Sequence, residues 1–381
     1  MTDFFAPCPR GLEKILESDL DAMGAKDVKA TEGGVAFSGD WTLCYRANLE
    51  SRIASRILWR VKETTFRAEQ DIYKAVHELS WHRWFDVSST IKVSTTAIRC
   101  ELKSVDFVTL LVKDAVCDRF REHCGERPSV DTFAPDMRIN VFIEEDRLML
   151  YLDTSGEALF KRGIRLHTNI APIRENLAAG ILRIAGWKPG IPLLDPMCGS
   201  GTFLIEAAQI ALNIMPGISR RFAFEKLLNF NQSLWQKLKD GAIAAQLPVQ
   251  ALDIYGSDLY GDAMKTASRN LQETGLLDCV SLKQANILEI SAPRDSGIMV
   301  ANLPYGERMG ELEELEELYP RLGDALKKKF SGWTAYLFTA DKAILKMMRL
   351  SPSKRTPLFN GAIECRLLEY RIVSGSNRPS K

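Results

Sequence analysis

Ten residues near the middle of the chain, Leu193 to Thr202, read Leu-Leu-Asp-Pro-Met-Cys-Gly-Ser-Gly-Thr. A short apolar run ends in an acid, a turn with two glycines follows, and Phe203 to Leu212 then has the pattern of a helix. A strand, a tight turn and a helix N-terminus in this order hold nucleotide-like ligands in open α/β sheets. Gly199 and Gly201 permit positive φ and let the backbone approach a ligand closely.

The kind of ligand is narrowed by what this turn lacks. The full G-x-G-x-x-G pattern and the lysine of a phosphate-binding loop are missing, so triphosphate binding is not supported. The acid at the end of the strand, Asp195, suits a ligand that carries an amino group better than one that carries phosphates. A second stretch, Ala301 to Gly306, reads Ala-Asn-Leu-Pro-Tyr-Gly and indicates how the ligand is used.

Strands and helices alternate from Thr168 onward, which predicts a doubly wound, mostly parallel sheet. Asn360-Gly361 is a strong hairpin turn signal and predicts an antiparallel pair at the edge of that sheet. Residues 213–251 have helical content at 232–245 and look like an insertion between a crossover helix and the second strand. The expected helices are 168–187, 202–212, 260–274, 311–328 and 341–348, and the expected strands are 191–195, 253–257, 279–283, 297–301, 356–359 and 362–370.

The first 165 residues read as two α+β regions. The first, up to about residue 40, has a strand at 4–6, an amphipathic helix at 9–23 and a hairpin of 26–31 with 35–38. The second has helices at 41–49, 71–79 and 104–124 and strands at 57–65, 90–97, 138–144 and 147–152. Glu145-Asp146 is the expected turn between the last two strands.

Three arginines, Arg52, Arg56 and Arg60, recur every fourth residue and form a basic stripe that could neutralise RNA phosphates. The alternative is a solvated face with salt bridges to Glu50 and Glu63. Residues 1–165 contain 24 Lys and Arg against 27 Asp and Glu, a net charge of −3. Charge alone therefore does not indicate RNA as a partner.

Composition excludes several other classes of protein. Hydrophobic residues make up 46% of the chain and charged residues 26%, as in a soluble globular protein. No apolar run is long enough to span a membrane, and the N-terminus lacks the features of a secretory signal. The eight cysteines are scattered without a C-x-x-C and there are only four histidines, so no metal site is expected. A reduced, cytoplasmic setting fits this cysteine usage best.

Two further strand ends carry polar residues suited to a nucleoside. Asp258 ends the second strand, where an acid commonly bonds a ribose hydroxyl. Its alternative role is to cap the helix that follows. The third strand leads into Gln284-Ala285-Asn286-Ile287, where a polar side chain could bond an adenine amino group.

The stretch Asn302-Leu303-Pro304-Tyr305 ends the fourth strand at the same edge and fits the activation of an exocyclic amine. The lone pair of such an amine is delocalised into its ring, which makes the nitrogen a poor nucleophile. The Asn302 side-chain oxygen and the Leu303 carbonyl would accept its hydrogens and stabilise the positive charge that develops during attack. Pro304 holds the backbone extended, and Tyr305 offers a ring for stacking. An ordinary Asn-x-Pro turn with a core tyrosine is the alternative.

Asp-Pro-Met-Cys-Gly-Ser-Gly-Thr followed by Asn-x-Pro-Tyr-Gly-Glu-Arg closely resembles the class I S-adenosylmethionine-dependent methyltransferases that modify exocyclic amines. The chain looks most like their THUMP-containing branch, which includes the bacterial 23S ribosomal RNA guanine-N2 methyltransferases of the RlmL type. Further likenesses are Phe5 to Glu13, Asp131 to Val141, Gly156 to Arg165 and Ile170 to Glu175. The resemblance covers nearly the whole chain.

This resemblance implies a Rossmann-like α/β methyltransferase domain at 166–373 and a polar tail at 374–381. Before them it implies a ferredoxin-like unit at 1–40, completed by segments near 55–66, and a THUMP RNA-binding domain at 41–165. S-adenosylmethionine would be the cofactor, and 23S ribosomal RNA or a pre-ribosomal particle the partner. Its methionine moiety would lie in the loop that contains Asp195, Pro196, Cys198, Gly199, Gly201 and Thr202, with Ala171 and Pro172 nearby. Asp258 would bond the ribose, Asn286 with Ile287 the adenine, and Asn302 to Tyr305 the target base.

Three departures from the family pattern bear on function. Leu303 replaces the first proline of the usual Asn-Pro-Pro-Tyr motif, so the carbonyl acceptor survives while the loop is expected to lose rigidity. Asn286 stands where the family often has Asp. Enterobacterial relatives carry a second methyltransferase domain, and this chain ends at Lys381 without it, so one modification is expected. The alternatives left open are transfer RNA guanine-N2 methylation, DNA adenine-N6 methylation and an RNA-binding assembly factor without activity.

Overall fold

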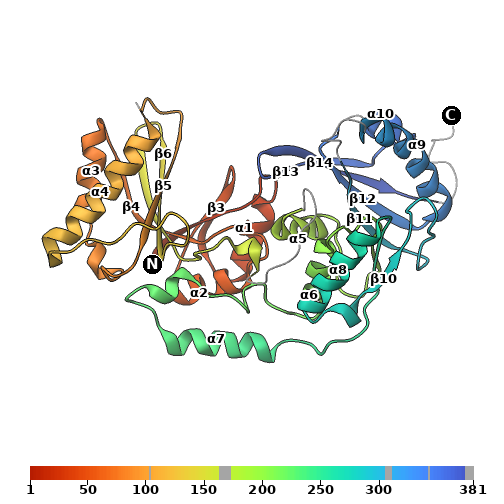
Figure 1. The fold of residues 1–381 in the computed structure, drawn as a ribbon, viewed down its shortest axis with the longest axis horizontal. Coiled ribbons are helices and arrows are strands. Elements are labelled where there is room, and N and C mark those ends of the chain that lie inside the picture. The colour runs from red at the N-terminus through yellow and green to blue at the C-terminus, as the bar shows by residue number, and fades with distance from the viewer. Residues whose placement is uncertain (103, 163–172, 305–310, 342–343, 374–381) are drawn as a thin grey trace. The chain divides into compact units, whose positions relative to one another are not determined.

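The chain divides into two compact units in the computed structural model (Figure 1). The first unit contains residues 1–8, 16–163 and 217–241, and the second contains residues 9–15, 164–216 and 242–381. The structure describes residues 1–102, 104–162, 173–304, 311–341 and 344–373. Ala171, Pro172, Tyr305 and the tail 374–381 lie outside the described residues.

One seven-stranded sheet forms the first unit, with the strand order β2-β3-β1-β4-β7-β6-β5. Neighbouring strands are antiparallel, except that β5 and β6 run parallel. β4 pairs with β1 through Leu58 and Trp59 and with β7 along residues 58–65, so both N-terminal α+β regions share one continuous sheet. The strands are β1 (Thr2–Pro7), β2 (Lys26–Thr31), β3 (Gly34–Gly39), β4 (Leu58–Thr65), β5 (Ile91–Ile98), β6 (Met137–Glu144) and β7 (Arg147–Asp153).

Side-chain caps and glycines define where the helices of this region begin and end. α4 begins after Ser104, whose hydroxyl accepts the Phe107 amide at 3.2 Å, and ends at Gly125 with φ 80°. The prediction that the first helix starts at Pro9 is wrong, because Gly11 has φ 92° and the chain turns there before the helix begins. The helices are α1 (Glu13–Ala22), α2 (Trp41–Glu50), α3 (Glu69–His77) and α4 (Val105–Cys124).

The second unit contains the doubly wound sheet that the sequence predicted, with the strand order β10-β9-β8-β11-β12-β14-β13. The five strands from β10 to β12 are parallel. β14 is antiparallel to β12, and β13 pairs with β14 as the expected edge hairpin around Asn360 and Gly361. The strands are β8 (Leu193–Asp195), β9 (Ile254–Asp258), β10 (Ser281–Gln284), β11 (Gly297–Asn302), β12 (Trp333–Thr339), β13 (Lys354–Asn360) and β14 (Ile363–Arg371).

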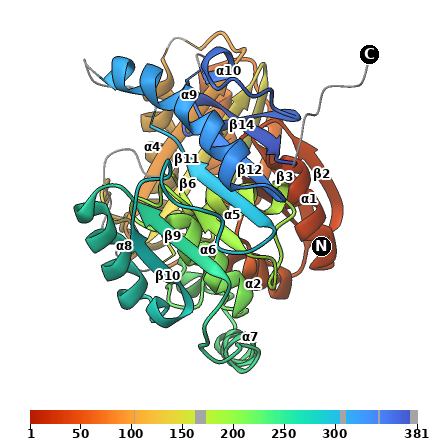
Figure 2. The same ribbon diagram turned by 90° about the vertical axis from the view of Figure 1, so that its right-hand side faces the viewer.

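Helices flank this second sheet (Figure 2) and close its apolar core. Leu322 and Leu326 of α9, and Phe330 directly after it, pack with Met299 of β11 and Leu337 of β12, and all five side chains are fully buried. Burial of this kind is the main favourable term in holding a helix on a sheet. The helices are α5 (Glu175–Ile184), α6 (Thr202–Ala211), α8 (Gly261–Glu273), α9 (Glu311–Lys329) and α10 (Ile344–Met347).

The insertion between α6 and β9 contains the predicted helix, α7 (Gln232–Ala244). The sequence did not reveal where it packs: residues 217–241 belong to the first unit. Rings of Phe224 and Trp235 lie with their centroids 4.5 and 6.2 Å from that of Tyr45. The insertion therefore contributes an aromatic cluster to the core of the N-terminal unit.

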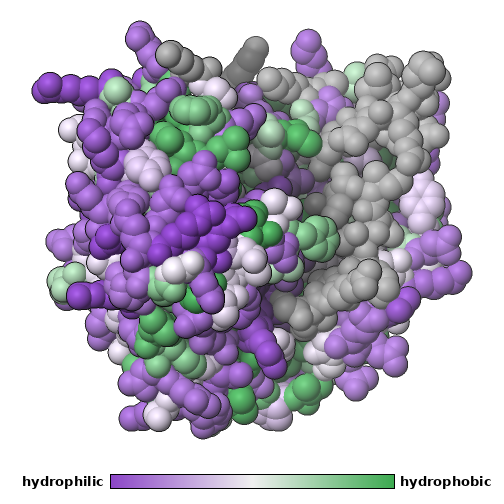
Figure 3. All heavy atoms as spheres, turned by 60° about the vertical axis from the view of Figure 1, so that its left-hand side comes forward, coloured by the Kyte–Doolittle hydropathy of each residue, from purple (hydrophilic) through white to green (hydrophobic). Residues whose placement is uncertain are grey.

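The surface drawn in Figure 3 is mainly hydrophilic, with hydrophobic side chains gathered in several smaller patches. Among the helices of the described residues, none is both long enough and apolar enough to cross a membrane. The polar residues that the sequence predicts for a ligand site lie at the ends of strands in the second sheet.

Candidate functional site at the carboxyl edge of the second sheet

Four strand ends bring the predicted polar residues to one edge of the second sheet. β8 ends at Asp195, β9 at Asp258 and β11 at Asn302, and Asn286 follows shortly after β10. These strands are parallel, so their carboxyl ends meet at the same edge. In open α/β sheets this is the edge at which ligands bind.

Backbone hydrogen bonds and two glycines fix the shape of the turn after Asp195. The Cys198 amide donates to the Ser257 carbonyl at 2.9 Å, and the Gly201 amide donates to the Cys198 carbonyl at 2.7 Å. Gly199 and Gly201 have φ values of 53° and 84°, the left-handed region that favours glycine. A Cβ on Gly199 would meet nothing within 4 Å, so a ligand has room above this residue. Pro196 and Thr202 lie buried on either side of the turn.

Asn270 of α8 supports the same turn and was not singled out from the sequence. Its side chain is fully buried, and its Nδ2 donates to the Ser200 carbonyl at 2.9 Å. Ala267, one turn earlier in α8, lies 3.4 Å from the position of a Cβ on Gly201. A polar residue in the middle of an amphipathic helix was the available signal, but only the fold shows which loop it reaches.

Asp195 carries a buried carboxylate that has no cation beside it among the described residues. Only 2% of the residue is exposed, and among the described residues its one hydrogen bond comes from the Met197 amide at 3.2 Å. Burial, and next the charge of Asp258, raise the pKa of Asp195 well above its ordinary value. A ligand with an amino group would relieve this by supplying a positive charge.

Cys198 lies in the same turn and is also buried. Burial, followed by the charges of Asp195 and Asp258, raises the pKa of its thiol far above the ordinary value. Since the thiolate is the reactive form of cysteine, this residue is suited to lining the turn and not to acting as a nucleophile.

Asp258 connects the ends of β9 and β8 through its carboxylate. Its two oxygens accept the amides of Gly199 at 3.0 Å and Tyr260 at 3.1 Å. Neither amide lies within α8, which begins at Gly261, so the structure does not support the helix-cap alternative. The neighbouring side chains of Leu259 and Tyr260 are 52% and 67% exposed, and the sequence had not indicated this apolar pair beside the acid.

Asn286 is half-buried and presents its side-chain amide after β10. Its Oδ1 accepts the Leu288 amide at 2.9 Å, while its Nδ2 has no hydrogen bond to a described residue. That nitrogen is therefore available as a donor. Ile287 differs, because its side chain is buried in the core cluster with Met299. Any contact of Ile287 with a ligand would have to come from its backbone.

Asn302 ends β11 with a side-chain oxygen that is buried and lacks a hydrogen bond among the described residues. An unsatisfied buried acceptor of this kind costs about 1–3 kcal/mol. The cost is recovered when a ligand donates to it, which marks Asn302 as a place where a donor is expected. Pro304 is exposed beside it, and Tyr305 lies outside the described residues.

Leu303 replaces the proline of the usual family motif, and the structure shows how the loop is held instead. The Leu303 amide donates to the Phe338 carbonyl of β12 at 2.9 Å, a bond that proline could not form. Its side chain is fully buried in the core cluster of the second unit. The expected loss of rigidity is thus countered by one hydrogen bond and one buried side chain.

The arginine stripe lies in the first unit and is largely engaged within the protein. Arg56 pairs with the buried Asp153 and also donates to the Gly156 carbonyl. Arg60 pairs with Asp3 at 2.6 Å and with Glu63 at 2.7 Å. Arg52 lies half-buried between α2 and β4.

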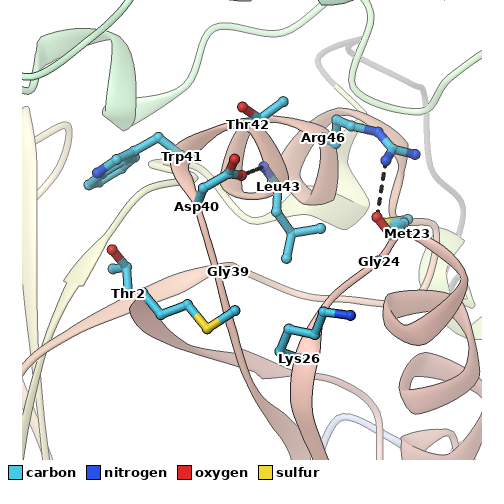
Figure 4. Close-up of a pocket in the computed structure, with 11 residues that line it drawn as sticks. Thr2, Met23, Gly24, Lys26, Gly39, Asp40, Trp41, Thr42, Leu43 and Arg46 are labelled. Atoms are coloured by element: carbon cyan, nitrogen blue, oxygen red, sulfur yellow. Dashed lines mark hydrogen bonds between the residues drawn. The ribbon is translucent and has the colours of Figure 1, made fainter.

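A hollow of about 510 Å³ occurs elsewhere in the first unit, between the end of α1 and the start of α2 (Figure 4). Arg46 crosses it to donate to the Met23 carbonyl at 3.1 Å and also pairs with Glu50 at 2.7 Å. Asp40 accepts the Leu43 amide at 2.8 Å and so caps α2. The Arg46 guanidinium and the Asp40 carboxylate in this hollow thus have partners within the protein, in contrast to Asp195 and Asn302 among the described residues. Among the described residues there is no cluster of His, Cys, Asp or Glu side chains able to hold a metal ion.

Three family models match the chain in succession. Residues 3–58 match the RlmL ferredoxin-like domain, residues 66–153 the THUMP domain and residues 162–369 the RMKL-like methyltransferase domain. The last match covers more than half of the chain.

Two relatives show how far this likeness extends. A Synechocystis sp. protein named "Putative RNA methyltransferase slr0064" is 38% identical over 370 residues, which cover 97% of this chain and 96% of that protein. The ribosomal RNA large subunit methyltransferase K/L of Aeromonas salmonicida is 37% identical and covers 99% of this chain. This chain spans only 55% of that protein, about half its length.

A solved structure shares the same fold over almost the whole chain. It is the crystal structure of SMU.472, described as "a putative methyltransferase complexed with SAH", where SAH is S-adenosylhomocysteine. The two chains are 28% identical with a TM-score of 0.88, and the match covers 98% of this chain and 99% of the other.

Proposed function

Since the chain belongs to the RMKL-like methyltransferase family, with THUMP and RlmL ferredoxin-like domains, we propose that it methylates the N2 amine of a guanosine in 23S ribosomal RNA. The methyl donor of this family is S-adenosylmethionine. The ribosomal substrate is supported by the names of the relatives, and the N2 position by the motif at Asn302. The single observation that carries the proposal is the unsatisfied, buried Asn302 oxygen at the same sheet edge as the glycine turn.

The residues at this edge fit the cofactor in four ways. The buried Asp195 carboxylate has no cation beside it in the described part of the chain, and the amino group of the cofactor would supply one. Gly199 leaves open space above the turn. Asn286 retains a free amide nitrogen suited to the adenine, and Asp258 retains acceptor capacity for the ribose. We propose that Ala171 and Pro172 complete this site.

The chemistry asks little of the protein beyond orientation and charge. S-adenosylmethionine supplies an electrophilic methyl group when bound. The Asn302 oxygen and the Leu303 carbonyl accept hydrogens of the target amine, so its lone pair is directed outward and its developing positive charge is stabilised. Pro304 and Tyr305 would hold the base, which must leave its stack to reach this pocket. The amine nitrogen would form its new bond to the methyl carbon as the bond from that carbon to the donor sulfur breaks, which leaves S-adenosylhomocysteine, and a proton would leave the nitrogen.

The N-terminal unit is proposed to hold the RNA. In this proposal residues 1–40, with segments near 55–66, form the ferredoxin-like unit, 41–165 the THUMP domain and 166–373 the methyltransferase domain. Arg52, Arg56 and Arg60 remain candidate phosphate contacts, although the ion pairs of Arg56 and Arg60 weigh against them.

A nucleoside assay tests this function. The protein is incubated with methyl-labelled S-adenosylmethionine and, separately, with 23S ribosomal RNA, a pre-ribosomal particle, transfer RNA or DNA, and the products are digested to nucleosides. We expect N2-methylguanosine from ribosomal RNA or the particle. Label in transfer RNA alone, label in N6-methyladenine from DNA, or RNA binding without any transfer would each replace the proposal by the corresponding alternative.

A further inference from the structure

Phe133 is the most exposed aromatic side chain among those described in the first unit, at 94% exposure. It lies in the loop between α4 and β6, and the backbone of this loop is fixed. Asp131 Oδ1 accepts the amides of Phe133 at 2.8 Å and Ala134 at 3.0 Å. The loop therefore presents a large apolar ring to solvent from a preset turn, which limits the entropy lost when a partner binds it.

Two cations support this turn without a carboxylate partner. Lys92 Nζ donates to the Thr132 carbonyl at 2.9 Å, and Arg138 Nη2 lies 3.5 Å from the Phe133 carbonyl. The Arg138 Nε is buried and makes no hydrogen bond to a described residue. Neither side chain forms an ion pair in the described part of the chain, unlike Arg56 and Arg60.

The acids near the turn are already occupied. Asp131 is bonded to the two backbone amides of the turn, and Asp136 pairs with Lys226 and accepts from Thr90. Glu157, which lies near Arg138, pairs with Lys161 at 2.6 Å. Asp136 and Glu157 are thus each matched by a lysine, whereas Asp131 keeps its negative charge near Arg138. Lys92 and Arg138 together outweigh Asp131, which leaves a net positive charge at this turn.

An exposed ring beside cations without acidic partners matches the chemistry of a single-stranded nucleic acid. A base stacks on the ring, and its phosphates are attracted to the cations. We propose that Phe133, with Lys92 and Arg138, forms a contact for an unpaired nucleotide of the RNA substrate. This inference rests on the proposed RNA substrate and adds to it a specific contact distant in sequence from the arginine stripe.

Equilibrium binding of the full chain to labelled RNA tests the contact. Phe133→Ala is expected to weaken binding by about 5- to 100-fold, the range measured for loss of one stacked base, and by a similar factor at every salt concentration. Phe133→Trp keeps a stacking ring and is expected to retain the affinity. Phe107→Ala, which removes a 48%-exposed phenylalanine from α4, is the matched control and is expected to bind as the unmodified protein does.

The two cations predict a different signature. Lys92→Ala should make the negative slope of log affinity against log salt less steep by about 0.7–0.9, since each phosphate contact releases counterions and this variant loses one such contact. Unchanged RNA affinity in Phe133→Ala, or equal losses in Phe133→Ala and Phe107→Ala, would overturn the inference. If the unmodified protein methylates RNA and Phe133→Ala binds normally, this contact alone is wrong. If the unmodified protein neither binds nor methylates RNA, the proposed function fails first and this contact with it.

Discussion

The stripe arginines of the first unit and the polar residues at the edge of the second sheet differ in whether the protein itself supplies their partners. In the first unit the stripe arginines meet acids of the protein: Arg56 meets the buried Asp153, and Arg60 meets Asp3 and Glu63. At the edge of the second sheet, the Asp195 carboxylate has no cation beside it, and the Asn302 oxygen accepts no hydrogen bond within the described residues. A buried polar group left unpaired costs free energy, whereas pairing offsets part or all of the cost of removing the group from water.

This contrast indicates what each region does. Matched charges stabilise the chain that contains them, and they say little about ligands. Unmatched buried groups need an explanation, and here Asp195 and Asn302 end two neighbouring strands, where one ligand site could satisfy both. If this distinction holds, substitutions of the unpaired groups should impair function, and substitutions of the paired groups should impair stability.

Removing the unsatisfied acceptor is expected to have the largest effect on activity. Asn302→Ala should reduce turnover by about 10²–10³-fold, as loss of one donor or acceptor to a developing charge typically does. Cofactor affinity, measured by calorimetry, should remain near that of the unmodified protein. Asn302→Asp keeps an acceptor oxygen and should lose less turnover than Asn302→Ala. Collapse of cofactor binding in Asn302→Ala would show that the residue holds the cofactor instead.

Breaking a matched pair should affect stability and not chemistry. Arg56→Ala leaves Asp153 buried without its cation, which is expected to cost about 3 kcal/mol, the low end for buried pairs because a quarter of the Arg56 side chain is exposed. Denaturant unfolding measures this cost. Methyl transfer at a temperature where the variant remains folded should be nearly unchanged. A fall in turnover with no loss of stability would contradict the assignment of this ion pair to stability and not to function.

The raised pKa of Asp195 predicts that a rise in pH increases cofactor affinity and decreases the stability of the ligand-free protein. Because its pKa in the folded protein is raised, its carboxylate forms only as the pH rises through that raised pKa. Cofactor affinity should therefore increase with pH across this range and level off above it. Asp195→Asn should weaken cofactor binding by about 10- to 100-fold, the contribution of a hydrogen bond to a charged group, and should flatten the pH profile. An unaltered profile would exclude Asp195 as the titrating group.

The same shift predicts the stability of the ligand-free protein. Between the ordinary pKa of 3.8 and the raised value, the folded state holds a proton that the unfolded state has released. Stability therefore falls as the pH rises through this window. Asp195→Asn removes this loss and should unfold at a higher denaturant concentration than the unmodified protein at neutral pH, even though it binds cofactor less well.

Much of the fold and of the second-unit site could be predicted from the sequence. The alternation of strands and helices, the edge hairpin and the strand ends at Asp195, Asp258 and Asn302 depend on local patterns, and the structure confirms them. The family match and the S-adenosylmethionine cofactor are confirmed as well.

What could not be predicted depends on contacts between distant segments. Nothing local in residues 217–241 indicates that they pack around Tyr45, and nothing in Asn270 indicates that it holds the Ser200 carbonyl. The partners of the arginine stripe could not be predicted for the same reason. Spacing reveals where charges lie along the chain, but only the fold reveals which charges are already paired.

The smallest effect is expected for Arg60, in comparison with Lys92 of the same unit. Arg60→Ala removes pairs with Asp3 and Glu63, which are partly exposed, so the unfolding free energy should change by no more than about 1 kcal/mol. The two acids that pair with Arg60 offset its attraction for a phosphate. We therefore expect Arg60→Ala to reduce the steepness of the salt dependence of RNA binding less than Lys92→Ala does. Equal or larger loss of slope in Arg60→Ala would restore the arginine stripe as the phosphate contact and would show that pairing within the protein does not exclude a charge from binding.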